Sequence, residues 1–573
     1  MRKILEYCRP HWKLMLFGLL LKFSASMMEL VIPSILEKIL DDVVPTRNIG
    51  SVFLWGGIMI LCALYTVFGN ITANRMSAKS SGRVTLALRH DLFARVSSLS
   101  AGQTDAFTIP SLVSRLTSDT YNVNQMVARV QRLGVRAPIL LIGGILITLM
   151  MDAKLTLVLA ATLPLIFLVV WLVSRISVPM YTYTQSVLDR LVRTVQENVT
   201  GVRVIKALSK TEYEKQRFDR INHELASAEQ RAASVMAISN PMTSLILNLG
   251  LCGVVLYGAH RVNLGLTQPG TIIAFLSYFA IILNAVLGIT RIFTLCAKGI
   301  ASARRISEVL GTPDDMITED RPGLETDAKL VFDHVSFSYL KQQDNLTDVS
   351  FQLKRGQTLG ILGTTGSGKS TLVQLLLRFY DPDSGAIYLD GRDLRSLDRA
   401  DLTGHFGVAF QKDFWIADTI RANIDYGRGL GDAAIRRALE HAQAAEFVDA
   451  LEDGWNHRLT VRGTNLSGGQ RQRLLIARAL AGNPDILILD DSSSALDYRT
   501  DAALRQCLYH SYPDTTKVII AQRISAIQHA DLILVLDDGH VIGQGTHAAL
   551  LEACDMYALI AETQMGSGVE HNA

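Results

Sequence analysis

The apolar residues of this 573-residue chain gather before residue 300, in long runs separated by polar stretches. An α-helix needs about 20 apolar residues to cross a bilayer core of ~30 Å. Segments of about that length lie at 14–36, 52–72, 134–151, 155–176, 242–262 and 270–292. We therefore predict six membrane-spanning helices.

Two connections between these segments are long and rich in basic residues. The stretches 73–133 and 177–241 hold about 60 residues each, contain few Gly or Pro, and show helical spacing of apolar positions. Each is expected to form two helical arms of ~30 residues, which reach ~45 Å at 1.5 Å per residue. Because Lys and Arg concentrate in these connections and in the N-terminal flank, we place them and both termini on the cytoplasmic side.

The pattern changes after residue 310. Residues 311–327 are acidic and turn-rich, as in a linker. From 328 the short apolar runs 486–489, 518–521 and 532–536 indicate buried parallel strands. The expected fold is thus an all-α six-helix transmembrane domain (1–310), a linker (311–327) and an α/β P-loop domain (328–573).

Composition supports this division. Hydrophobic residues make up 49% of the chain and charged residues 19%, which fits a membrane half joined to a water-soluble half. The net charge of +2 gives no basic excess for nucleic-acid binding. The six cysteines are scattered, so we expect neither a zinc site nor a disulfide framework.

The sequence GTTGSGKS follows a short apolar strand and precedes a helical pattern, which is the context of a P-loop. Its glycines let backbone N–H groups wrap phosphates, and the helix N-terminus adds positive potential. Lys369 is expected to reach the β- and γ-phosphates of a nucleotide and Ser370 to bind Mg²⁺. The predicted phosphate-binding residues are Gly363, Thr364, Thr365, Gly366, Ser367, Gly368, Lys369, Ser370 and Thr371. Asp490 ends the apolar run 486–489 and is expected to support the Mg²⁺ ion.

The segment NLSGGQRQR at 465–473 lies between these two motifs and resembles the signature of ABC ATPases. With six spans before it, the whole chain resembles one half of an ABC exporter of the multidrug or lipid type. The resemblance implies ATP and Mg²⁺ as ligands, Tyr339 stacked on adenine, and Gln411 contacting Mg²⁺. It also implies that Ser467, Gly468, Gly469 and Gln470 face the ATP of a partner subunit, and that 494–497 links the two ATP sites. Coupling helices at the tips of the arms are then expected near Thr108–Ser114 and Ala207–Tyr213.

Two positions depart from that family's pattern. Asp491 stands where the family usually has the Glu that polarises the attacking water, and Gln522 stands where it usually has His. Asp is one methylene shorter, and displacing a catalytic group by ~1 Å can cost about 10²-fold in rate. Gln cannot become a cation. We therefore expect a weakened ATP site in this chain and a heterodimer with a homologous half-transporter that carries Glu and His.

The expected function is ATP-driven export of small amphipathic drugs or lipids by alternating access, from a bacterial inner (plasma) membrane with the ATPase domain in the cytoplasm. The alternatives are a dedicated peptide or metabolite exporter, an importer with an exporter-like fold, and an ATP-binding regulatory subunit. Glu29, Asn248 and Asn284 lie inside the spans and are candidate substrate residues. Glu29 is expected either to meet a cationic drug or to pair with Arg291 or another basic group, and the two asparagines either to line the cavity or to bond between helices.

Overall fold

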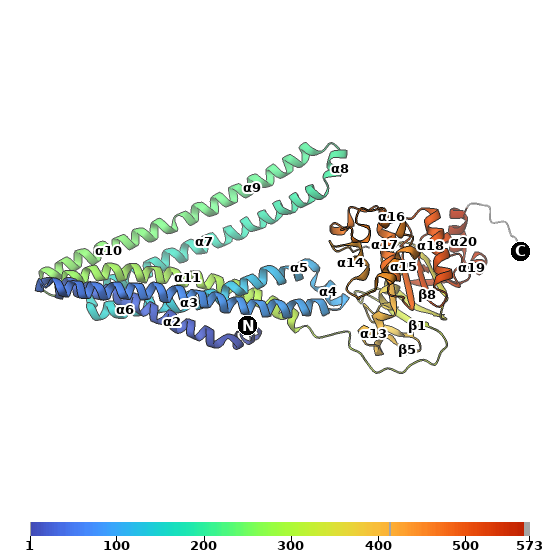
Figure 1. Cartoon of the computed structure of the whole chain (residues 1–573). Helices are drawn as coiled ribbons and strands as arrows, with labels where there is room; N and C mark the ends of the chain where they lie inside the picture. Colours follow the sequence, from blue (N-terminus) through green and yellow to red (C-terminus); the bar gives the residue numbers. More distant parts are fainter. Residues whose placement is uncertain (1, 412–413, 566–573) are drawn as a thin grey trace. The chain divides into compact units, whose positions relative to one another are not determined.

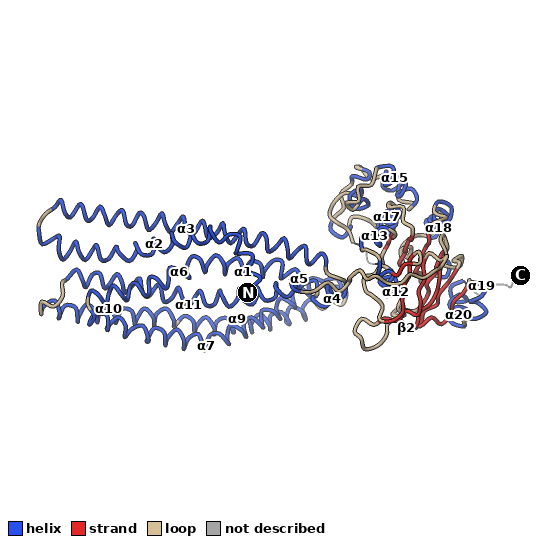
Figure 2. The backbone as a smooth tube through the Cα atoms, turned by 90° about the horizontal axis from the view of Figure 1, so that it is seen from below, coloured by secondary structure: helices blue, strands red, loops and turns tan. Residues whose placement is uncertain are grey.

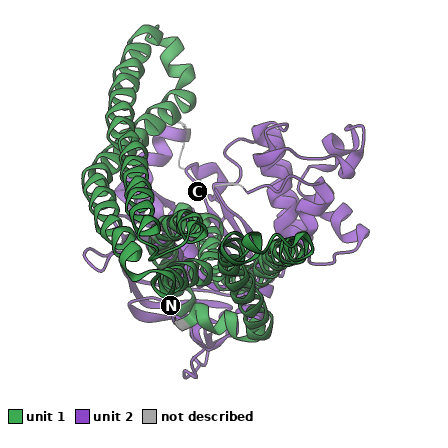
Figure 3. Cartoon of the chain, turned by 90° about the vertical axis from the view of Figure 1, so that its left-hand side faces the viewer, with its two compact units in different colours: residues 1–97, 110–311 green, residues 98–109, 312–573 purple. Residues whose placement is uncertain are grey.

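The computed structural model describes residues 2–411 and 414–565. These residues form two compact units, shown in different colours in Figure 3. The first unit runs to residue 97 and includes 110–311; the second comprises 98–109 and the chain from 312 onward. The short segment 98–109 thus groups with the C-terminal part of the chain, although it is enclosed in sequence by the membrane helices.

The first unit is entirely helical. Its elements are α1 (Arg2–Cys8), η1 (Arg9–His11), α2 (Trp12–Lys38), η2 (Ile39–Val43), η3 (Val44–Thr46), α3 (Ile49–Ser98), α5 (Ile109–Ser114), η4 (Arg115–Asp119), α6 (Thr120–Met151), α7 (Ala153–Thr200), α8 (Val202–Ala207), α9 (Thr211–Ala237), α10 (Ser239–Asn263) and α11 (Pro269–Gly311). Six helical segments of the described chain are long and apolar enough to cross a membrane, as predicted.

Three membrane helices, α2, α6 and α11, pack around a shared apolar core. Tyr278 is fully buried there, and its hydroxyl donates a hydrogen bond of 2.6 Å to the backbone carbonyl of Leu30. Small residues allow the close approach: a Cβ on Gly144 would lie 2.8 Å from Ile282. This core fixes the relative positions of the polar side chains that α2 and α6 carry.

The helices extend well beyond the predicted spans and form the expected arms. In Figure 1, α7 and α9 run side by side and meet at α8. Short helices lie at or just before both expected tip segments. α5 covers most of Thr108–Ser114, but another short helix, α4 (Ala101–Phe107), precedes it, and α8 ends where Ala207–Tyr213 begins. The prediction missed a start signal, because Ser100 and Gln103 form a capping box that begins α4.

The second unit contains two sheets, drawn in red in Figure 2. An antiparallel sheet has the order β2-β1-β4-β5 and a six-stranded sheet the order β10-β9-β3-β8-β7-β6. The strands are β1 (Leu330–Phe337), β2 (Leu346–Leu353), β3 (Thr358–Gly363), β4 (Ser384–Leu389), β5 (Arg392–Asp393), β6 (Phe406–Ala409), β7 (Ile486–Asp490), β8 (Thr516–Ile520), β9 (Leu532–Asp537) and β10 (His540–Gly545).

Helices and short turns surround these strands. They are α4, α12 (Lys369–Leu376), η5 (Leu394–Ser396), α13 (Arg399–Gly404), α14 (Ile420–Asp425), α15 (Asp432–His441), α16 (Ala445–Asp449), η6 (Gly454–Asn456), η7 (Val461–Gly463), α17 (Gly468–Leu480), α18 (Tyr498–Ser511), η8 (Ile524–Ala526), α19 (His547–Ala553) and α20 (Asp555–Met565).

The apolar runs predicted as buried strands are β7, β8 and β9. β7 and β8 pair in parallel with both of their neighbours, and β9 pairs in parallel with β3 and antiparallel with β10. The apolar side chains of all three strands are almost all buried. Neighbouring parallel strands end at the same edge of a sheet, so the residues that follow β3, β7 and β8 come together. That edge carries the candidate site.

Candidate functional site

The predicted P-loop connects β3 directly to α12. Gly366 (φ +88°) and Gly368 (φ +97°) take left-handed conformations that strongly favour glycine, and a Cβ on Gly368 would lie 2.7 Å from the carbonyl oxygen of Asn345. The loop therefore bends sharply into the N-terminus of α12, where free backbone N–H groups favour an anion.

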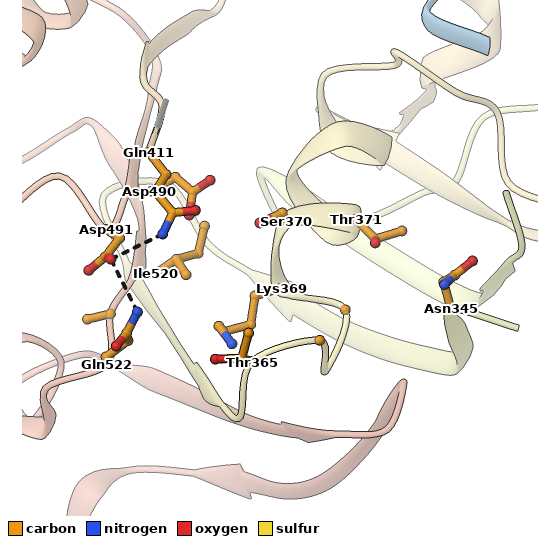
Figure 4. Close-up of a pocket in the computed structure, with 13 residues that line it drawn as sticks. Asn345, Thr365, Lys369, Ser370, Thr371, Gln411, Asp490, Asp491, Ile520 and Gln522 are labelled. Carbon is orange, nitrogen blue, oxygen red and sulfur yellow. Dashed lines mark hydrogen bonds between the residues drawn. The ribbon is translucent and has the colours of Figure 1, made fainter. Parts of the chain in front are cut away.

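Lys369 opens α12 and points back over the loop (Figure 4). Its ammonium donates to the carbonyl oxygens of Gly363 (2.9 Å) and Thr364 (2.5 Å) and to the Ser367 hydroxyl (3.4 Å). Burial lowers the pKa of Lys369, and the neighbouring carboxylates Asp490 and Asp491 partly offset this shift. A phosphate placed on the loop would exchange these neutral acceptors for anionic oxygens, which bind an ammonium more strongly.

Asp490 ends β7 and is 7% exposed. Its pKa is raised, chiefly by burial and further by the adjacent carboxylate of Asp491, while Lys369 acts in the opposite sense. A buried carboxylate near a second one favours a bound cation, which would relieve both effects. The hydroxyl of Ser370 and the amide of Gln411 line the same cavity, so the donor set is all oxygen, the chemistry that Mg²⁺ prefers.

Asp491 is held by two neutral amides. Its Oδ2 atom accepts from Nε2 of Gln522 at 3.3 Å and from Nε2 of Gln411 at 3.4 Å, as the dashed lines in Figure 4 mark. Its backbone is left-handed (φ +48°), and its N–H donates to the carbonyl of Ile520 in β8 at 3.0 Å. The carboxylate is thus oriented by groups that can donate hydrogen bonds but cannot carry a positive charge.

The cavity around these groups has a volume of about 320 Å³. Ten of the predicted residues line it together: Thr365, Gly366, Gly368, Lys369, Ser370, Thr371, Gln411, Asp490, Asp491 and Gln522. Gly363, Thr364 and Ser367 do not line it, but all three contact the ammonium of Lys369.

Tyr339 stands outside this cavity. Its hydroxyl donates to Gln374 at 2.6 Å and lies 3.3 Å from the hydroxyl of Thr371, and its ring packs edge-on against Phe337 and Tyr380. Asn345, Ile520 and Ala521 line the cavity but were not predicted. The place of Ile520 and Ala521 in the cavity follows from the pairing of β8 with β7, which sets the end of β8 beside Asp490. Asn345 lies in the loop between β1 and β2 and carries no motif that would have marked it.

The segment predicted to face a partner's nucleotide lies away from this cavity. Ser467 caps α17, accepting from the N–H of Gln470 at 3.3 Å, while the Gln470 side chain accepts from the N–H of Ser467 at 2.9 Å. None of 467–470 lines the cavity. The glycines of this segment pack on 494–497, since a Cβ on Gly469 would lie 3.1 Å from the carbonyl of Ala495.

Gln472 joins these parts and was missed by the sequence reasoning. Its side-chain oxygen accepts from the N–H of Ala495 at 2.9 Å, and its Nε2 atom donates to the Ser494 hydroxyl at 3.1 Å and lies 3.5 Å from the carbonyl of Asp491. Gln472 therefore ties α17 to the loop that begins at Asp491. Gln472 lies inside the segment 465–473 that resembles the signature, and only that place could have suggested its role.

The first unit brings two of the three candidate substrate residues together. Glu29 and Asn284 line a cavity of about 280 Å³ among α2, α6 and α11, together with Arg136. Glu29 pairs with Arg136 through two hydrogen bonds, Nη2 to Oε1 at 2.6 Å and Nε to Oε2 at 3.1 Å. The side chain of Arg291, the partner we named for Glu29, lies outside the described residues.

The two asparagines lie in different surroundings. Asn248 does not line this cavity. Each side-chain amide donates to a carbonyl one turn earlier in its own helix, Asn248 to Ser244 at 2.9 Å and Asn284 to Ala280 at 3.0 Å. Asn284 thus takes the first of the two expected places, in the cavity wall, and in both side chains the local backbone acceptor satisfies the amide N–H.

The tip helix α4 makes specific contacts within the second unit. The hydroxyl of Tyr380 donates to Oδ2 of Asp105 at 2.5 Å, and the Ser100 hydroxyl donates to Asp315 at 2.8 Å. Burial and the Asp105 carboxylate both raise the pKa of Tyr380, so its hydroxyl remains a donor well into the alkaline range. These bonds join the segment 98–109 to the rest of the second unit.

Comparison with known proteins gives a consistent result. Residues 15–286 match the family model of the ABC transporter transmembrane region, and 346–494 match that of the ABC transporter. A Bacillus subtilis protein described as an uncharacterized ABC transporter ATP-binding protein is 34% identical over 99% of both chains. The ATP-dependent lipid A-core flippase of Nitrosococcus oceani is 30% identical over all of this chain and 96% of its own.

A solved structure shares the fold. The ATP-bound structure of a bacterial Atm1-family ABC exporter superposes with a TM-score of 0.81 over 98% of this chain and 99% of that one, at 24% identity.

Proposed function

Since this chain belongs to the ABC transporter family, as a half-transporter with membrane helices and an ATP-hydrolysing domain in one polypeptide, we propose that it is the weak-site subunit of a heterodimeric exporter. Family membership establishes ATP binding, a multi-pass membrane protein and pairing with another ABC subunit. The proposal concerns what distinguishes this chain: a slow ATP site of its own and an intact signature offered to its partner.

The observation that carries the proposal is the arrangement around Asp491. Its short side chain is bonded by the neutral amides of Gln411 and Gln522, where the family usually places Glu beside His. A carboxylate that is ~1 Å short of the attacking water can cost about 10²-fold. Gln522 can donate a hydrogen bond to a γ-phosphate, but it adds no positive charge.

The remaining ATP residues support binding rather than rapid turnover. Lys369 and the loop 363–368 would hold the phosphates, Thr371 would lie beside them, and Tyr339 would reach adenine if its ring turned outward. Ser370, Gln411 and Asp490 would hold Mg²⁺, whose charge neutralises phosphate oxygens when bound. All of these groups fit a nucleotide, so the expected defect lies in the hydrolytic step.

The proposed partner subunit contributes to both ATP sites. ATP sites in this family form between two chains, and the segment Ser467–Gln470 of this chain would close over the partner's nucleotide. The proposed partner carries Glu and His at the positions of Asp491 and Gln522, which gives the pair one fast and one slow site. Nucleotide binding would draw the two ATPase domains together and turn the membrane cavity outward; hydrolysis at the fast site would reset it.

The proposed cargo is a small amphipathic molecule, a drug or a lipid. The relative named as a lipid A-core flippase supports a lipid-like cargo. We propose a bacterial inner membrane with both termini and the ATPase domain in the cytoplasm, and domain limits of 1–310 and 328–573 around a linker at 311–327. A dedicated peptide or metabolite exporter, an importer and a regulatory subunit remain the competing functions.

The test is ATP hydrolysis by the full-length chain in detergent, alone and with the gene neighbour most similar to it. We expect turnover only in the pair, lost when the neighbour's Glu is changed to Gln and largely kept in Asp491→Asn. Rapid turnover by this chain alone, abolished by Asp491→Asn, would refute the proposal. Uptake and efflux assays in vesicles of defined orientation separate import from export.

A further inference from the structure

The segment that carries Gln522 leaves the sheet at the end of β8. The ladders of β8 with its two neighbours both end at Ile520, and Ala521 after it is buried. Gln522 and Arg523 are exposed, and the chain returns to the core at Ile524, which is fully buried. The backbone of Gln522 therefore lies in a short exposed stretch that the sheet does not fix.

A side chain of the C-terminal helix α20 holds this stretch. Nε2 of Gln564 donates to the carbonyl of Gln522 at 2.7 Å, and Oε1 of Gln564 accepts from the N–H of Ile524 at 2.8 Å. Both distances are slightly shorter than the usual 2.9–3.0 Å of N–H···O bonds. One side-chain amide thus fixes the two peptide groups that flank Arg523.

The helix α20 is itself anchored beside this segment. Tyr557 and Ala561 are buried in the same apolar cluster as Ala521 and Ile524. Residues three and four positions apart lie on one face of a helix, so Gln564 continues the face of Tyr557 and Ala561 as a polar residue. Gln564 therefore reaches the segment from a helix whose position apolar contacts already fix.

The turn that follows the segment has a separate support. The guanidinium of Arg505 in α18 donates to the carbonyl of Ser525 in η8 and pairs with Asp501 at 2.5 Å. Because α18 holds η8 in this way, loss of the bonds from Gln564 would release Gln522 without unfolding the turn.

The place of Gln522 bears on the hydrolytic step. Its side chain lines the cavity of about 320 Å³ together with Lys369, and its Nε2 atom donates to Oδ2 of Asp491 at 3.3 Å. Displacing a functional group by ~1 Å can cost about 10²-fold in rate. The backbone at Gln522 determines how far its amide extends into the cavity.

We propose that Gln564 is a positioning residue for ATP hydrolysis, which sets the reach of Gln522 toward the γ-phosphate by fixing the backbone on either side of Arg523. The role of Gln564 rests on the proposed role of Gln522 at that phosphate. None of the described residues that line the cavity belongs to α20, so Gln564 acts through Gln522 and not on the nucleotide.

The experiment measures phosphate release at saturating ATP, and ATP affinity by equilibrium binding, in the assembled pair after the partner's catalytic Glu has been changed to Gln. If this chain hydrolyses ATP by itself, the same measurements are made on the chain alone, because only ratios between variants are compared. The weak-site proposal is decided separately, by the absolute rate of the chain alone.

Gln564→Glu separates positioning from support of the fold. Its carboxylate still accepts from the N–H of Ile524 but cannot donate to the carbonyl of Gln522. Thr563→Glu, at an exposed neighbouring position of α20, is the matched control for the added charge.

We expect Gln564→Glu and Gln564→Ala each to slow phosphate release about five- to tenfold at unchanged ATP affinity. The melting temperature of Gln564→Glu should stay that of the unmodified chain, and Thr563→Glu should release phosphate at the normal rate. Gln522→Ala should slow release at least as much, and Gln564→Ala should add nothing in the Gln522→Ala background, because one residue acts through the other.

Normal phosphate release by Gln564→Glu, or an additive loss in the double variant, would overturn the role of Gln564 and leave that of Gln522 intact. A loss of ATP affinity in Gln564→Glu, or an equal loss of rate in Thr563→Glu, would also overturn it, because the effect would then come from the fold or from the added charge. If Gln522→Ala itself releases phosphate at the normal rate, the proposed roles of both residues are wrong.

Discussion

Lengthening the carboxylate at position 491 should convert the slow ATP site into a faster one. In this chain, Oδ2 of Asp491 lies 3.3 and 3.4 Å from the amide nitrogens of Gln522 and Gln411. Both distances exceed the usual 2.9–3.0 Å for N–H···O bonds, so each contributes at the low end of about 0.5–1.5 kcal/mol. Asp491→Glu can therefore extend past these amides at little cost.

The size of the gain follows from the displacement. An added methylene moves the carboxylate by ~1 Å, and misplacement on that scale is associated with about 10² in rate, or about 2.7 kcal/mol. We expect Asp491→Glu alone to raise turnover about tenfold, and Asp491→Glu with Gln522→His to approach a hundredfold. The second change adds a side chain that can carry positive charge beside the γ-phosphate.

The assay must report ATP hydrolysis at this chain's site without a contribution from the partner's site. Phosphate release is measured in the assembled pair after the partner's catalytic Glu has been changed to Gln, with Asp555→Glu, an exposed carboxylate at the start of α20, as the matched control. ATP affinity is measured in parallel and should not change. If the double variant binds ATP normally and releases phosphate no faster, the length of the carboxylate does not limit this site.

Three further predictions address the groups around the site. Gln472→Ala removes the hydrogen bonds from α17 to Ser494 and Ala495. ATP turnover by the pair should slow several-fold, while ATP affinity measured by equilibrium binding should not change. A loss of ATP affinity would instead make Gln472 part of the nucleotide pocket. Tyr380→Phe deletes a charge-assisted hydrogen bond to Asp105 worth about 1.5–3 kcal/mol. This change should reduce the stimulation of ATPase activity by transported substrate more than it reduces basal ATPase activity. Equal loss of both activities would contradict a role for α4 in coupling. Burial lowers the pKa of Lys369, so its ammonium loses its proton at a lower pH than that of a free lysine. ATP affinity, measured by titration at a series of pH values, should therefore be constant near neutrality and decline on the alkaline side before the pH at which a free lysine loses its proton. An affinity that holds up to the usual lysine pKa would show that bound phosphate restores the pKa.

The sequence predicted the features that depend on local pattern. Six apolar runs of bilayer length became membrane helices, and the apolar runs at 486–489, 518–521 and 532–536 became parallel strands. The P-loop could be placed because its glycines, lysine and flanking strand and helix are contiguous in sequence. Parallel pairing then brings Asp491 and Gln522 to one edge, although 31 positions separate them.

What the sequence did not predict depends on contacts between distant segments. Asn345 enters the cavity from the loop between β1 and β2, and Arg136 meets Glu29 across more than a hundred residues. Neither contact has a local signature. The tip helix α4 was missed for a different reason, since its capping box at Ser100 and Gln103 is a readable signal that the broader helical pattern obscured.

In the proposed heterodimer, the nucleotide bound by this chain outlasts the one bound by its partner. Photoreactive ATP carrying a label on either the α- or the γ-phosphate, cross-linked to the assembled pair after one turnover, tests it directly. We expect this chain to retain both labels and the partner to retain only the α-label, because only the partner has released its γ-phosphate. Equal loss of the γ-label from both chains would contradict it, and would make Asp491 a competent catalytic base.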